Sequence, residues 1–283
     1  MSTDLLTADG LRSSQGGVFA YVSPSRLGCW IKCPRAFAFR YQEGIKTPTT
    51  PSLFVGTVVH AGLEVVYRHR QLGIFLEAGD VGKRLMDSWA GLVDEEEMTF
   101  DSPAEEQRLQ NQALDLVRAY LAYVPVDEPK PLAVEAAIEA PLIDPTTGED
   151  FGIPLVGIVD LILDDGGGNG DGDGALICDF KTTARSSGPI EIVHEIQLTS
   201  YSYLFRHVQQ RQEAGLEIRS LVKTKTPKIE FHSYPARTEA HFSRLFAIVR
   251  EYLDALDSGR FNFRPGFGCA MCDFQKQCRR WSG

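Results

Sequence analysis

Two charged residues close a short apolar stretch of the chain, and their spacing could serve chemistry. Residues 176–183 read LICDFKTT, which predicts a buried strand that ends with Asp179 and Lys181. Residues i and i+2 of a strand point to the same face, so a carboxylate and an ammonium are aimed at one place. The pair is either a surface ion pair, which contributes little to stability, or a catalytic pair. In the second case the carboxylate holds a metal and the lysine handles water or a phosphate.

A second carboxylate is expected opposite the first. Asp160 stands among aliphatic residues in GIVDLIL, where an unpaired charge is costly to bury. If the glycine- and aspartate-rich stretch 165–174 forms a symmetric hairpin loop, Asp160 lies opposite Asp179 on adjacent antiparallel strands. The Cβ atoms of such neighbours are about 4.5–5.5 Å apart. Two carboxylates at that distance favour a hard divalent cation between them, such as magnesium or manganese.

A histidine, a glutamine and a tyrosine could complete the site. His60 lies in the helical stretch FVGTVVHAGLE, and Glu64 follows one turn later on the same face. A lone histidine on an apolar helix is usually a satisfied core residue, but the neighbouring glutamate favours a ligand role. Gln197 and Tyr201 are spaced i and i+4 on a later helix, which places an amide beside a phenol.

The elements that must position these residues follow from capping and periodicity. Ser23-Pro24 and Cys33-Pro34 each predict the start of a short helix. Beyond Pro131 the pattern changes from helical to strand-like. We expect helices over 52–71, 78–98, 104–123, 191–213 and 238–257, strands over 132–143, 151–163 and 175–183, and a hairpin of strands 218–224 and 228–234. The predicted fold class is α/β, with a mixed central sheet flanked by helices.

The composition is that of an ordinary globular protein. The 283 residues are 43% hydrophobic and 24% charged. We find no signal-peptide pattern at the N-terminus and no apolar run long enough for a membrane span, so we expect a cytoplasmic protein with reduced cysteines. The net charge of −9 argues against a broad nucleic-acid-binding surface. Basic residues nevertheless cluster locally, and the candidates for gripping DNA are Lys223, Lys225, Lys228, Arg260 and Arg264.

Four motifs follow one another in an order that resembles the RecB-type nucleases of the PD-(D/E)XK superfamily: GTVVH, GIVD, DFK and QLTSY. The resemblance covers most of residues 23–283 and implies a restriction-endonuclease-like core. It implies a divalent-metal site formed by His60, Asp160, Asp179 and the backbone carbonyl of Phe180. It also implies that Lys181 positions or activates the attacking water, and that Gln197 and Tyr201 line the site and touch DNA phosphate. Val159 stands in place of the superfamily's eponymous proline, as is usual in the RecB branch.

Three cysteines stand close together in the C-terminal tail: Cys269, Cys272 and Cys278. Three thiolates leave a tetrahedral metal or a cubane cluster one ligand short, so the fourth must come from elsewhere in the chain. Cys178 lies beside Asp179 on the opposite strand face and is interpreted as a small buried residue. This leaves two candidates near the N-terminus, Cys29 and Cys33.

The segment SRLGCWIKCPR is similar to the N-terminal motif of the iron–sulfur branch of these nucleases, which includes the AddB nuclease domain and the CRISPR adaptation exonucleases. This similarity implies Cys33 as the fourth ligand of a [4Fe–4S] cluster, with Cys29 as runner-up and zinc as the alternative cargo. Trp30 stands where tyrosine is more usual. The implied layout is a flexible tail (1–22) and a single nuclease domain (23–283), with a helical insertion at about 72–128. The cluster would join the N-terminal helix to the tail at about 260–283.

These features predict a metal-dependent DNA exonuclease that hydrolyses phosphodiesters at single-stranded ends, in DNA repair, recombination or CRISPR adaptation. Its partners would be DNA and helicase, recombination or CRISPR adaptation proteins, with no membrane contact. The alternative is a non-catalytic DNA-binding or complex-assembly subunit with a structural metal site. Such a subunit would lack an aspartate or the lysine, and none is missing. A zinc-stabilised RNA-binding module is disfavoured because paired aspartates would repel RNA in the absence of metal.

Overall fold

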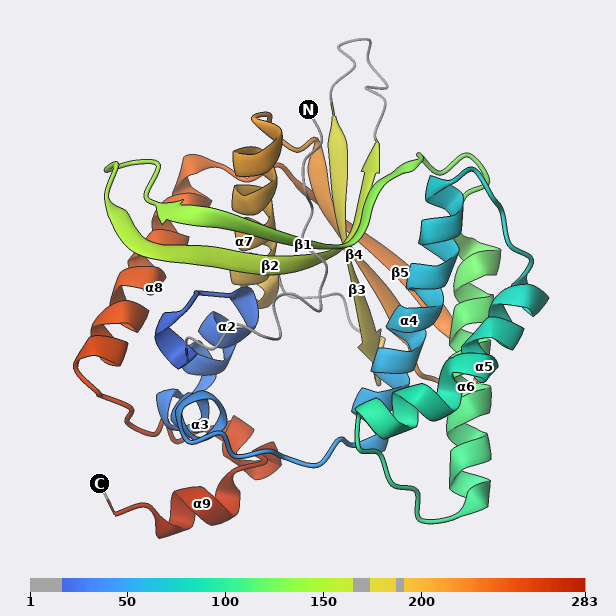
Figure 1. Cartoon of the computed structure of the whole chain (residues 1–283), viewed down its shortest axis with the longest axis horizontal. Coiled ribbons are helices and arrows are strands. Elements are labelled where there is room, and N and C mark those ends of the chain that lie inside the picture. The colour runs from blue at the N-terminus through green and yellow to red at the C-terminus, as the bar shows by residue number, and fades with distance from the viewer. Residues whose placement is uncertain (1–16, 165–173, 187–190, 283) are drawn as a thin grey trace.

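A mixed sheet of five strands forms the centre of the structure, a computed structural model that describes residues 17–164, 174–186 and 191–282. The spatial order is β1-β2-β3-β4-β5, and helices cover both faces (Figure 1). β3 and β4 run parallel, and the other neighbouring strands run antiparallel. The strands are β1 (Pro131–Ile143), β2 (Asp150–Asp164), β3 (Ala175–Thr183), β4 (Gly215–Val222) and β5 (Lys228–Pro235).

Two groups of helices bury the two faces of the sheet in separate cores. One core, which includes Leu63, Leu116 and Leu163, lies under α4 (Pro51–Gln71), α5 (Ala78–Glu95) and α6 (Pro103–Tyr123). The other core, which includes Leu27 and Leu204, lies under α2 (Pro24–Lys32), α7 (Glu191–Gln209) and α8 (Glu239–Asp257). Shorter helical segments are η1 (Gly17–Phe19), α3 (Pro34–Phe37), the π-helical η2 (Ala38–Gln42), η3 (Phe267–Met271) and α9 (Gln275–Arg280). The result is a layered α/β/α arrangement.

Three helices begin at the same local signal, a hydroxyl residue followed by proline. Ser23, Thr50 and Ser102 are the N-caps of α2, α4 and α6, and each side-chain oxygen accepts a hydrogen bond from a backbone N–H three residues later. Proline is favourable at the next position because its N–H would have no helical partner there. The capped start of α4 fixes where this helix begins, and the helix carries His60, a candidate ligand.

A buried polar and aromatic network fixes α4 against the sheet. Arg219 on β4 is 3% exposed, and its Nη1 donates to the hydroxyls of Tyr67 at 2.9 Å and Tyr120 at 2.7 Å. The ring of Phe180 on β3 packs against the same two tyrosines, with centroid distances of 5.9 and 5.6 Å. A buried guanidinium needs such partners to offset its lost hydration. The network therefore holds α4 and α6 in fixed positions relative to β3.

Every helix and strand predicted from the sequence is found within the described residues, with some ends shifted. The helix predicted over 191–213 ends at Gln209, because Gln210 has a left-handed φ of +53° and turns the chain. Glu213 is then buried beyond the helix, where it accepts a hydrogen bond from Arg206 at 2.7 Å. The helix predicted over 78–98 likewise ends at Glu95, shortly before the left-handed Glu97.

The flexible tail expected over residues 1–22 divides into two portions. Residues 17–22 pack on the fold: Val22 is fully buried, and its N–H donates to the Pro154 carbonyl at 2.9 Å. Residues 1–16 lie outside the described residues, as does the predicted hairpin loop except for Gly174. None of the helices within the described ranges is long and apolar enough to cross a membrane.

Candidate active site

Three acidic side chains lie in a row across β1, β2 and β3. Glu135 falls between two pairs of the β1–β2 ladder, Val134–Leu161 and Ala136–Val159, and this position lies opposite Asp160. The β2–β3 register, continued by one position beyond its last pair, places Asp179 opposite Asp160 from the other side. Directly opposed residues share a face of the sheet, so the three carboxylates are neighbours. The opposition of the two aspartates that the symmetric hairpin predicts agrees with this register.

Side chains replace main-chain pairing at this row. The ladder between β2 and β3 ends at Leu161 and Cys178. One position further on, Asp160 Oδ2 accepts a hydrogen bond of 2.7 Å from the backbone N–H of Phe180. Glu135 has a left-handed φ of +45°, a strained conformation for a residue with a side chain. The carboxylate of Asp160 thus satisfies a backbone donor that regular pairing would otherwise use.

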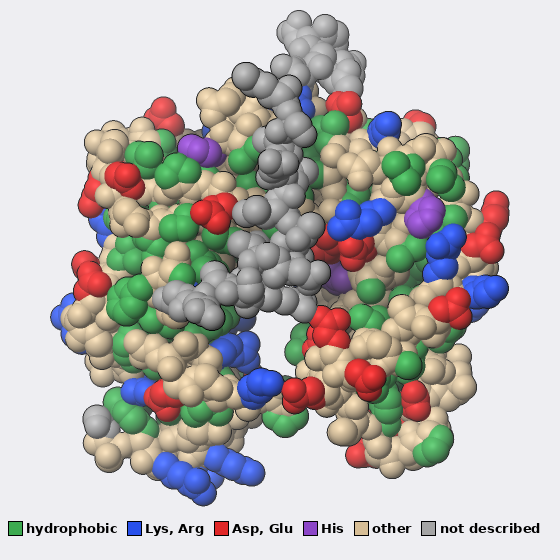
Figure 2. All heavy atoms as spheres, in the orientation of Figure 1, with side chains coloured by type: hydrophobic (Ala, Val, Ile, Leu, Met, Phe, Trp, Pro, Cys, Tyr) green, Lys and Arg blue, Asp and Glu red, His purple; other side chains and the backbone are tan. Residues whose placement is uncertain are grey.

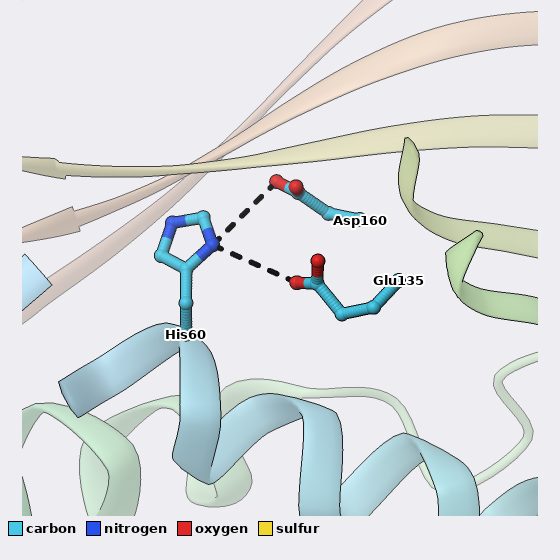
Figure 3. A group of neighbouring side chains, drawn as sticks. All are labelled: His60, Glu135 and Asp160. Carbon is cyan, nitrogen blue, oxygen red and sulfur yellow. Dashed lines mark ion pairs between the residues drawn. The ribbon is translucent and has the colours of Figure 1, made fainter. Parts of the chain in front are cut away.

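His60 of α4 completes a cluster of possible metal ligands (Figure 3). Its Nδ1 lies 3.9 Å from Glu135 Oε1 and 3.9 Å from Asp160 Oδ2, which are ion-pair rather than hydrogen-bond distances. Ligand atoms from the three residues lie within 4.8 Å of one another. Two ligands on opposite sides of one divalent ion are separated by about 4–5 Å, twice a metal–oxygen bond length. The three side chains therefore have the spacing of a single ion's ligands.

Asp179 is held by a lysine and a glutamine. Its Oδ2 lies 2.6 Å from Lys181 Nζ, although the angles of this ion pair are not those of a hydrogen bond. Its Oδ1 accepts a hydrogen bond of 2.8 Å from Gln197 Nε2, which also donates to the Tyr201 hydroxyl at 2.9 Å. Asp179 is 1% exposed, whereas the side chain of Lys181 is 30% exposed. A buried carboxylate that orients a half-exposed lysine differs from an ion pair on the surface.

Crowding of buried charges shifts pKa values in the row. Burial raises the pKa of Asp160 to about 7, and the negative charge of Asp179 adds to this effect. Burial by itself would lower the pKa of His60, but Glu135, Asp160 and Asp179 outweigh it and raise that pKa above its usual 6.5. Both shifts favour the protonated forms: burial is the main cause for Asp160, and the neighbouring carboxylates are the cause for His60. A bound metal ion would displace such protons.

The donor atoms suit a hard divalent cation. Carboxylate oxygens together with one imidazole nitrogen are ligands for magnesium or manganese, whereas softer ions favour thiolates. The orientation of the side chains toward a common point, the ligand spacing and the raised pKa of Asp160 all agree with this chemistry. The residues present therefore fit the metal that the resemblance implies.

Glu135 is a site residue that the sequence motifs did not identify. The sequence pattern pairs His60 with Glu64, which instead accepts a hydrogen bond of 2.7 Å from Arg68 one turn along α4. The signal for Glu135 was an acid within the apolar strand LAVEAAIEA, the same kind of signal that identified Asp160. Glu139 shares that strand, however, and the sequence pattern does not say which of the two glutamates faces the site.

A cavity of about 1640 Å³ extends from the end of β3 to the cysteines. Lys181, Gln197 and Tyr201 line one part of it. Its basic lining residues are Lys32, Arg35, Arg40, Lys181, Arg264 and Arg279, and its acidic one is Asp273. In a chain with a net charge of −9, such a concentration of positive charge indicates a site for an anion.

Cysteines from both ends of the sequence meet in this cavity. They are Cys29, Cys33, Cys269, Cys272 and Cys278. Burial raises the pKa of the Cys278 thiol, and the proximity of three other thiols, Cys33 among them, raises it further. The pKa of Cys29 is raised by burial and, to a smaller extent, by two neighbouring thiols. The N-terminal helix and the tail therefore bring their sulfur atoms into one region.

The tail cysteines and Cys178 lie in different parts of the molecule. Phe274 of the tail packs on Phe39 with a centroid distance of 5.7 Å, which places the tail beside η2. Cys178 is fully buried in the core beneath α4 and α6, with its sulfur 4.0 Å from a Glu217 oxygen. Cys178 is thus the small buried residue that the sequence predicts.

The basic residues predicted to grip DNA do not gather in one place. Lys223 donates to the carbonyl and hydroxyl of a serine in the first turn of α4, at 2.9 and 2.7 Å, and burial lowers its pKa. Lys225 and Lys228 are exposed in the same hairpin. Arg264 lines the cavity, while Arg260 is exposed nearby in sequence and donates to a serine hydroxyl. Lys223 therefore has a structural contact, and Arg264 is the member that reaches the cavity.

Comparison with known proteins gives a family and a fold. A sequence model of the PD-(D/E)XK nuclease superfamily matches residues 21–279. A crystal structure of a candidate exonuclease from Eubacterium rectale has a TM-score of 0.60 and 14% identity, covering 98% of this chain and 94% of the other. A crystal structure of SSO0001 has a TM-score of 0.43 and 13% identity, covering 97% and 92%. None of the curated proteins compared with the chain matches it.

Proposed function

Because the chain belongs to the PD-(D/E)XK nuclease superfamily, we propose that it hydrolyses DNA phosphodiesters with a divalent metal, as an exonuclease on single-stranded ends. The observation that carries the proposal is the row of Glu135, Asp160 and Asp179 with His60 facing it. Burial and like charge raise the pKa of Asp160 to about 7, so the row favours a cation. The fold neighbour named as a candidate exonuclease supports the choice of exonuclease over endonuclease.

The metal would be held by the acidic row. The ligands we propose are His60, Asp160, Asp179 and the backbone carbonyl of Phe180, with Glu135 added from β1. When bound, magnesium or manganese supplies Lewis acidity to the phosphoryl group. The hydrogen bond from the Phe180 N–H fixes the carboxylate of Asp160 before any ligand arrives. The acids are therefore positioned by the sheet itself.

The remaining residues would handle the substrate. Lys181 reaches solvent from the end of β3, so it can position the attacking water and offset negative charge in the transition state. Gln197 bonds both Asp179 and Tyr201, which orients its amide along the cavity wall. We propose that Gln197 and Tyr201 line the path of the scissile phosphate, as the resemblance to RecB-type nucleases implies.

We propose a [4Fe–4S] cluster on Cys33, Cys269, Cys272 and Cys278, which would place the chain in the iron–sulfur branch. These cysteines line one cavity, and the other three thiols are close enough to Cys278 to raise its pKa, which supports a shared cargo. Its role would be structural, because it closes a loop of more than two hundred residues. Zinc is the alternative cargo, and Cys29 the alternative ligand.

The wider assignment rests on the resemblance alone. We propose residues 23–283 as one nuclease domain, with about 72–128 as its helical insertion. DNA repair, recombination or CRISPR adaptation would supply the single-stranded ends and the protein partners, in the cytoplasm. The exposed Lys225 and Lys228 and the cavity residue Arg264 are the proposed contacts with the DNA backbone.

The proposal is tested by incubating the protein with end-labelled single- and double-stranded DNA in magnesium, manganese or chelator. Labels at either end report the direction of degradation. The expected result is progressive shortening of single strands in either metal and none in chelator. Absence of cleavage on every substrate with either metal would favour the non-catalytic DNA-binding alternative.

A further inference from the structure

The helices α5 and α6 stand beside α4 on one side of the sheet, and they carry no residue of the acidic row (Figure 1). Together they contain seven aspartates and glutamates against four lysines and arginines. On the face shown in Figure 2, acidic and basic side chains are intermixed over this side of the molecule. A pair of helices with net negative charge is poorly suited to bind DNA phosphates. What these helices add to the site therefore lies in their buried contacts.

A glutamate just beyond α6 neutralises two arginines. Glu128 lies between α6 and β1, and its side chain is 3% exposed. It accepts hydrogen bonds from Arg219 on β4 and Arg70 on α4, and a third of 2.9 Å from the hydroxyl of Tyr67. Loss of one partner from a buried ion pair leaves an uncompensated charge. The position of Arg219 therefore depends on a residue supplied by the end of α6.

A ring connects this guanidinium to the acidic row. Tyr67 and Tyr120 accept hydrogen bonds from Arg219. The ring of Phe180 lies against both tyrosines, stacked on the first at 27° and edge-on to the second at 89°. The same ring meets the imidazole of His60 edge-on, with a centroid distance of 6.0 Å. These are favourable separations for aromatic pairs. The tyrosines thus fix a ring that touches a candidate metal ligand.

The backbone of Phe180 reaches the row as well. Its N–H is the donor to Asp160 Oδ2 at 2.7 Å, and Asp179 and Lys181 are its neighbours in sequence. The residue is 3% exposed, so its ring has little room to move without its backbone. A displacement of this ring would therefore alter the hydrogen bond to one acid and the strand segment that carries another.

We propose that α6 and the segment after it set the geometry of the acidic row, through contacts that run from Glu128 by way of Arg219 to Phe180. The proposal deepens the proposed function and rests on it for the identity of the metal. The side chains of these three residues would be positioning groups, because they act through His60 and Asp160. Residues that orient metal ligands typically change metal affinity 10–100-fold when they are replaced.

The test compares Glu128→Gln with Glu213→Gln. Glu213 is the matched control, because it is 2% exposed and pairs with Arg206 at 2.7 Å, and its partners lie on α7 and just before α8. Each substitution keeps the shape of the side chain and removes one buried negative charge. Both variants should therefore melt at a lower temperature than the wild-type protein. Only Glu128→Gln should disturb the row.

The first measurement needs no metal. Protein labelled with ¹⁵N in phenylalanine alone is observed by nuclear magnetic resonance, and Phe180→Leu identifies the Phe180 amide signal by its loss. We expect Glu128→Gln to shift this signal and to speed its hydrogen exchange, because the bond to Asp160 is weakened. Glu213→Gln should leave the signal unchanged. An unchanged signal in Glu128→Gln, or equal shifts in both variants, overturns the proposal.

A milder variant covers the case in which Glu128→Gln does not fold. Tyr120→Phe removes one acceptor of Arg219 and keeps the ring, so it should shift the same signal by a smaller amount. Its control is Tyr203→Phe, which removes a bonded hydroxyl from the other core. Equal spectra for Tyr120→Phe and the wild-type protein would overturn the proposal without the first variant.

Manganese binding separates this proposal from the proposed function. Electron paramagnetic resonance on metal-stripped protein should show binding about 10–100-fold weaker in Glu128→Gln and Phe180→Leu, and unchanged in Glu213→Gln. Wild-type affinity in the first two variants overturns the proposal but leaves the metal site intact. If the wild-type protein binds no manganese, the proposed function fails, and the amide signal still decides whether Glu128 positions Phe180.

Discussion

The acidic row and the cysteine cluster both join residues that are distant in sequence, but the protein holds them in different ways. The row stands on three adjacent strands and a capped helix, and Asp160 and Asp179 are 9% and 1% exposed. Neither η3 nor α9, which carry Cys269 and Cys278, has a buried residue, and Cys269 is exposed. The row is therefore preformed, whereas we expect the tail to depend for its order on the proposed cargo.

This difference predicts different consequences of replacing one residue. Removing an acid from the row takes away a ligand but leaves the sheet, because the strands are paired and packed on both sides. Removing a cysteine would remove the proposed cargo of the tail, so we expect stability and function to fall together. Activity and thermal stability measured on the same variants therefore show whether the two regions are held in different ways.

The largest effect is expected for Asp179→Asn. The amide keeps the volume and can still bond Gln197, but it loses the negative charge that faces Lys181 and the proposed metal. Cleavage should fall by at least about 100-fold, the scale of losing one electrostatic contact in a transition state. Thermal denaturation should show an unchanged fold. The matched control is Glu64→Gln on α4, which should cut normally because Glu64 pairs with Arg68. Wild-type cleavage by Asp179→Asn would exclude this site assignment.

A smaller loss of activity, with a clear loss of stability, is expected for Cys33→Ser. Protein purified without oxygen should be brown and hold about four irons per chain, as a four-thiolate cubane does. Cys33→Ser should lose the iron and melt at a lower temperature, and its cleavage should fall indirectly through loosening of the aromatic and basic segment 35–41. Cys29→Ser is the control and should keep the cluster.

Metal analysis of the same proteins decides between the alternatives. Stoichiometric zinc without iron or sulfide in anaerobic protein would identify zinc as the cargo. A full cluster in Cys33→Ser would transfer the ligand role to Cys29 or another residue. Loss of iron with unchanged melting would show that the tail is ordered without its cargo, and the two regions would then be held in the same way.

The metal-free protein should become less stable as pH rises. Between the ordinary value of 3.8 and about 7, folded Asp160 keeps a proton that the unfolded chain has lost, so raising the pH favours unfolding. His60, with a raised pKa, contributes in the same direction, since its stabilisation is lost as pH rises through that value. The full effect of Asp160 is at most on the order of 4 kcal/mol. It is measured by denaturation of metal-free protein across this range.

Two controls identify the source of this pH dependence. Asp160→Asn should flatten it, because the amide does not titrate. Magnesium should stabilise the wild-type protein more at high pH than at low pH, since metal and protons compete for the row. Equal slopes for the wild-type protein and Asp160→Asn would show that other groups cause the dependence.

The smallest effects are expected for the exposed lysines of the β4–β5 hairpin. Lys225→Ala with Lys228→Ala should weaken DNA binding slightly and reduce the slope of log affinity against log salt by about one for each phosphate that the variant no longer neutralises. Arg264→Ala should do the same from the cavity side. Lys223→Ala should instead lower stability, because it removes hydrogen bonds to the start of α4. The salt slope could be unchanged in the hairpin variant and reduced in Arg264→Ala. That result would mean that the DNA contacts the cavity with the cysteines and does not contact the hairpin.

The sequence predicts the regular parts of the site better than its irregular ones. Asp160 can be identified from the sequence because an acidic residue is unusual in an apolar strand. Asp179 follows from it, because a symmetric hairpin loop determines which residue of the next strand lies opposite Asp160. Glu135 is missed because its orientation depends on a left-handed φ at a gap in the β1–β2 pairing, which no periodicity encodes. The sequence KTKTPK suggests that Lys223 is a free cation. The structure shows that it donates a hydrogen bond to a backbone carbonyl in the first turn of α4.

The most direct test of the central claim is a manganese titration of metal-stripped wild-type protein. Bound manganese is measured by electron paramagnetic resonance, and the cleavage rate of single-stranded DNA is measured on the same samples. The acidic row predicts no cleavage in chelator and a rate that rises with the bound metal until the site is saturated. A rate that persists in chelator, or a saturated site that cuts no DNA, would contradict the assignment of this row as the catalytic centre.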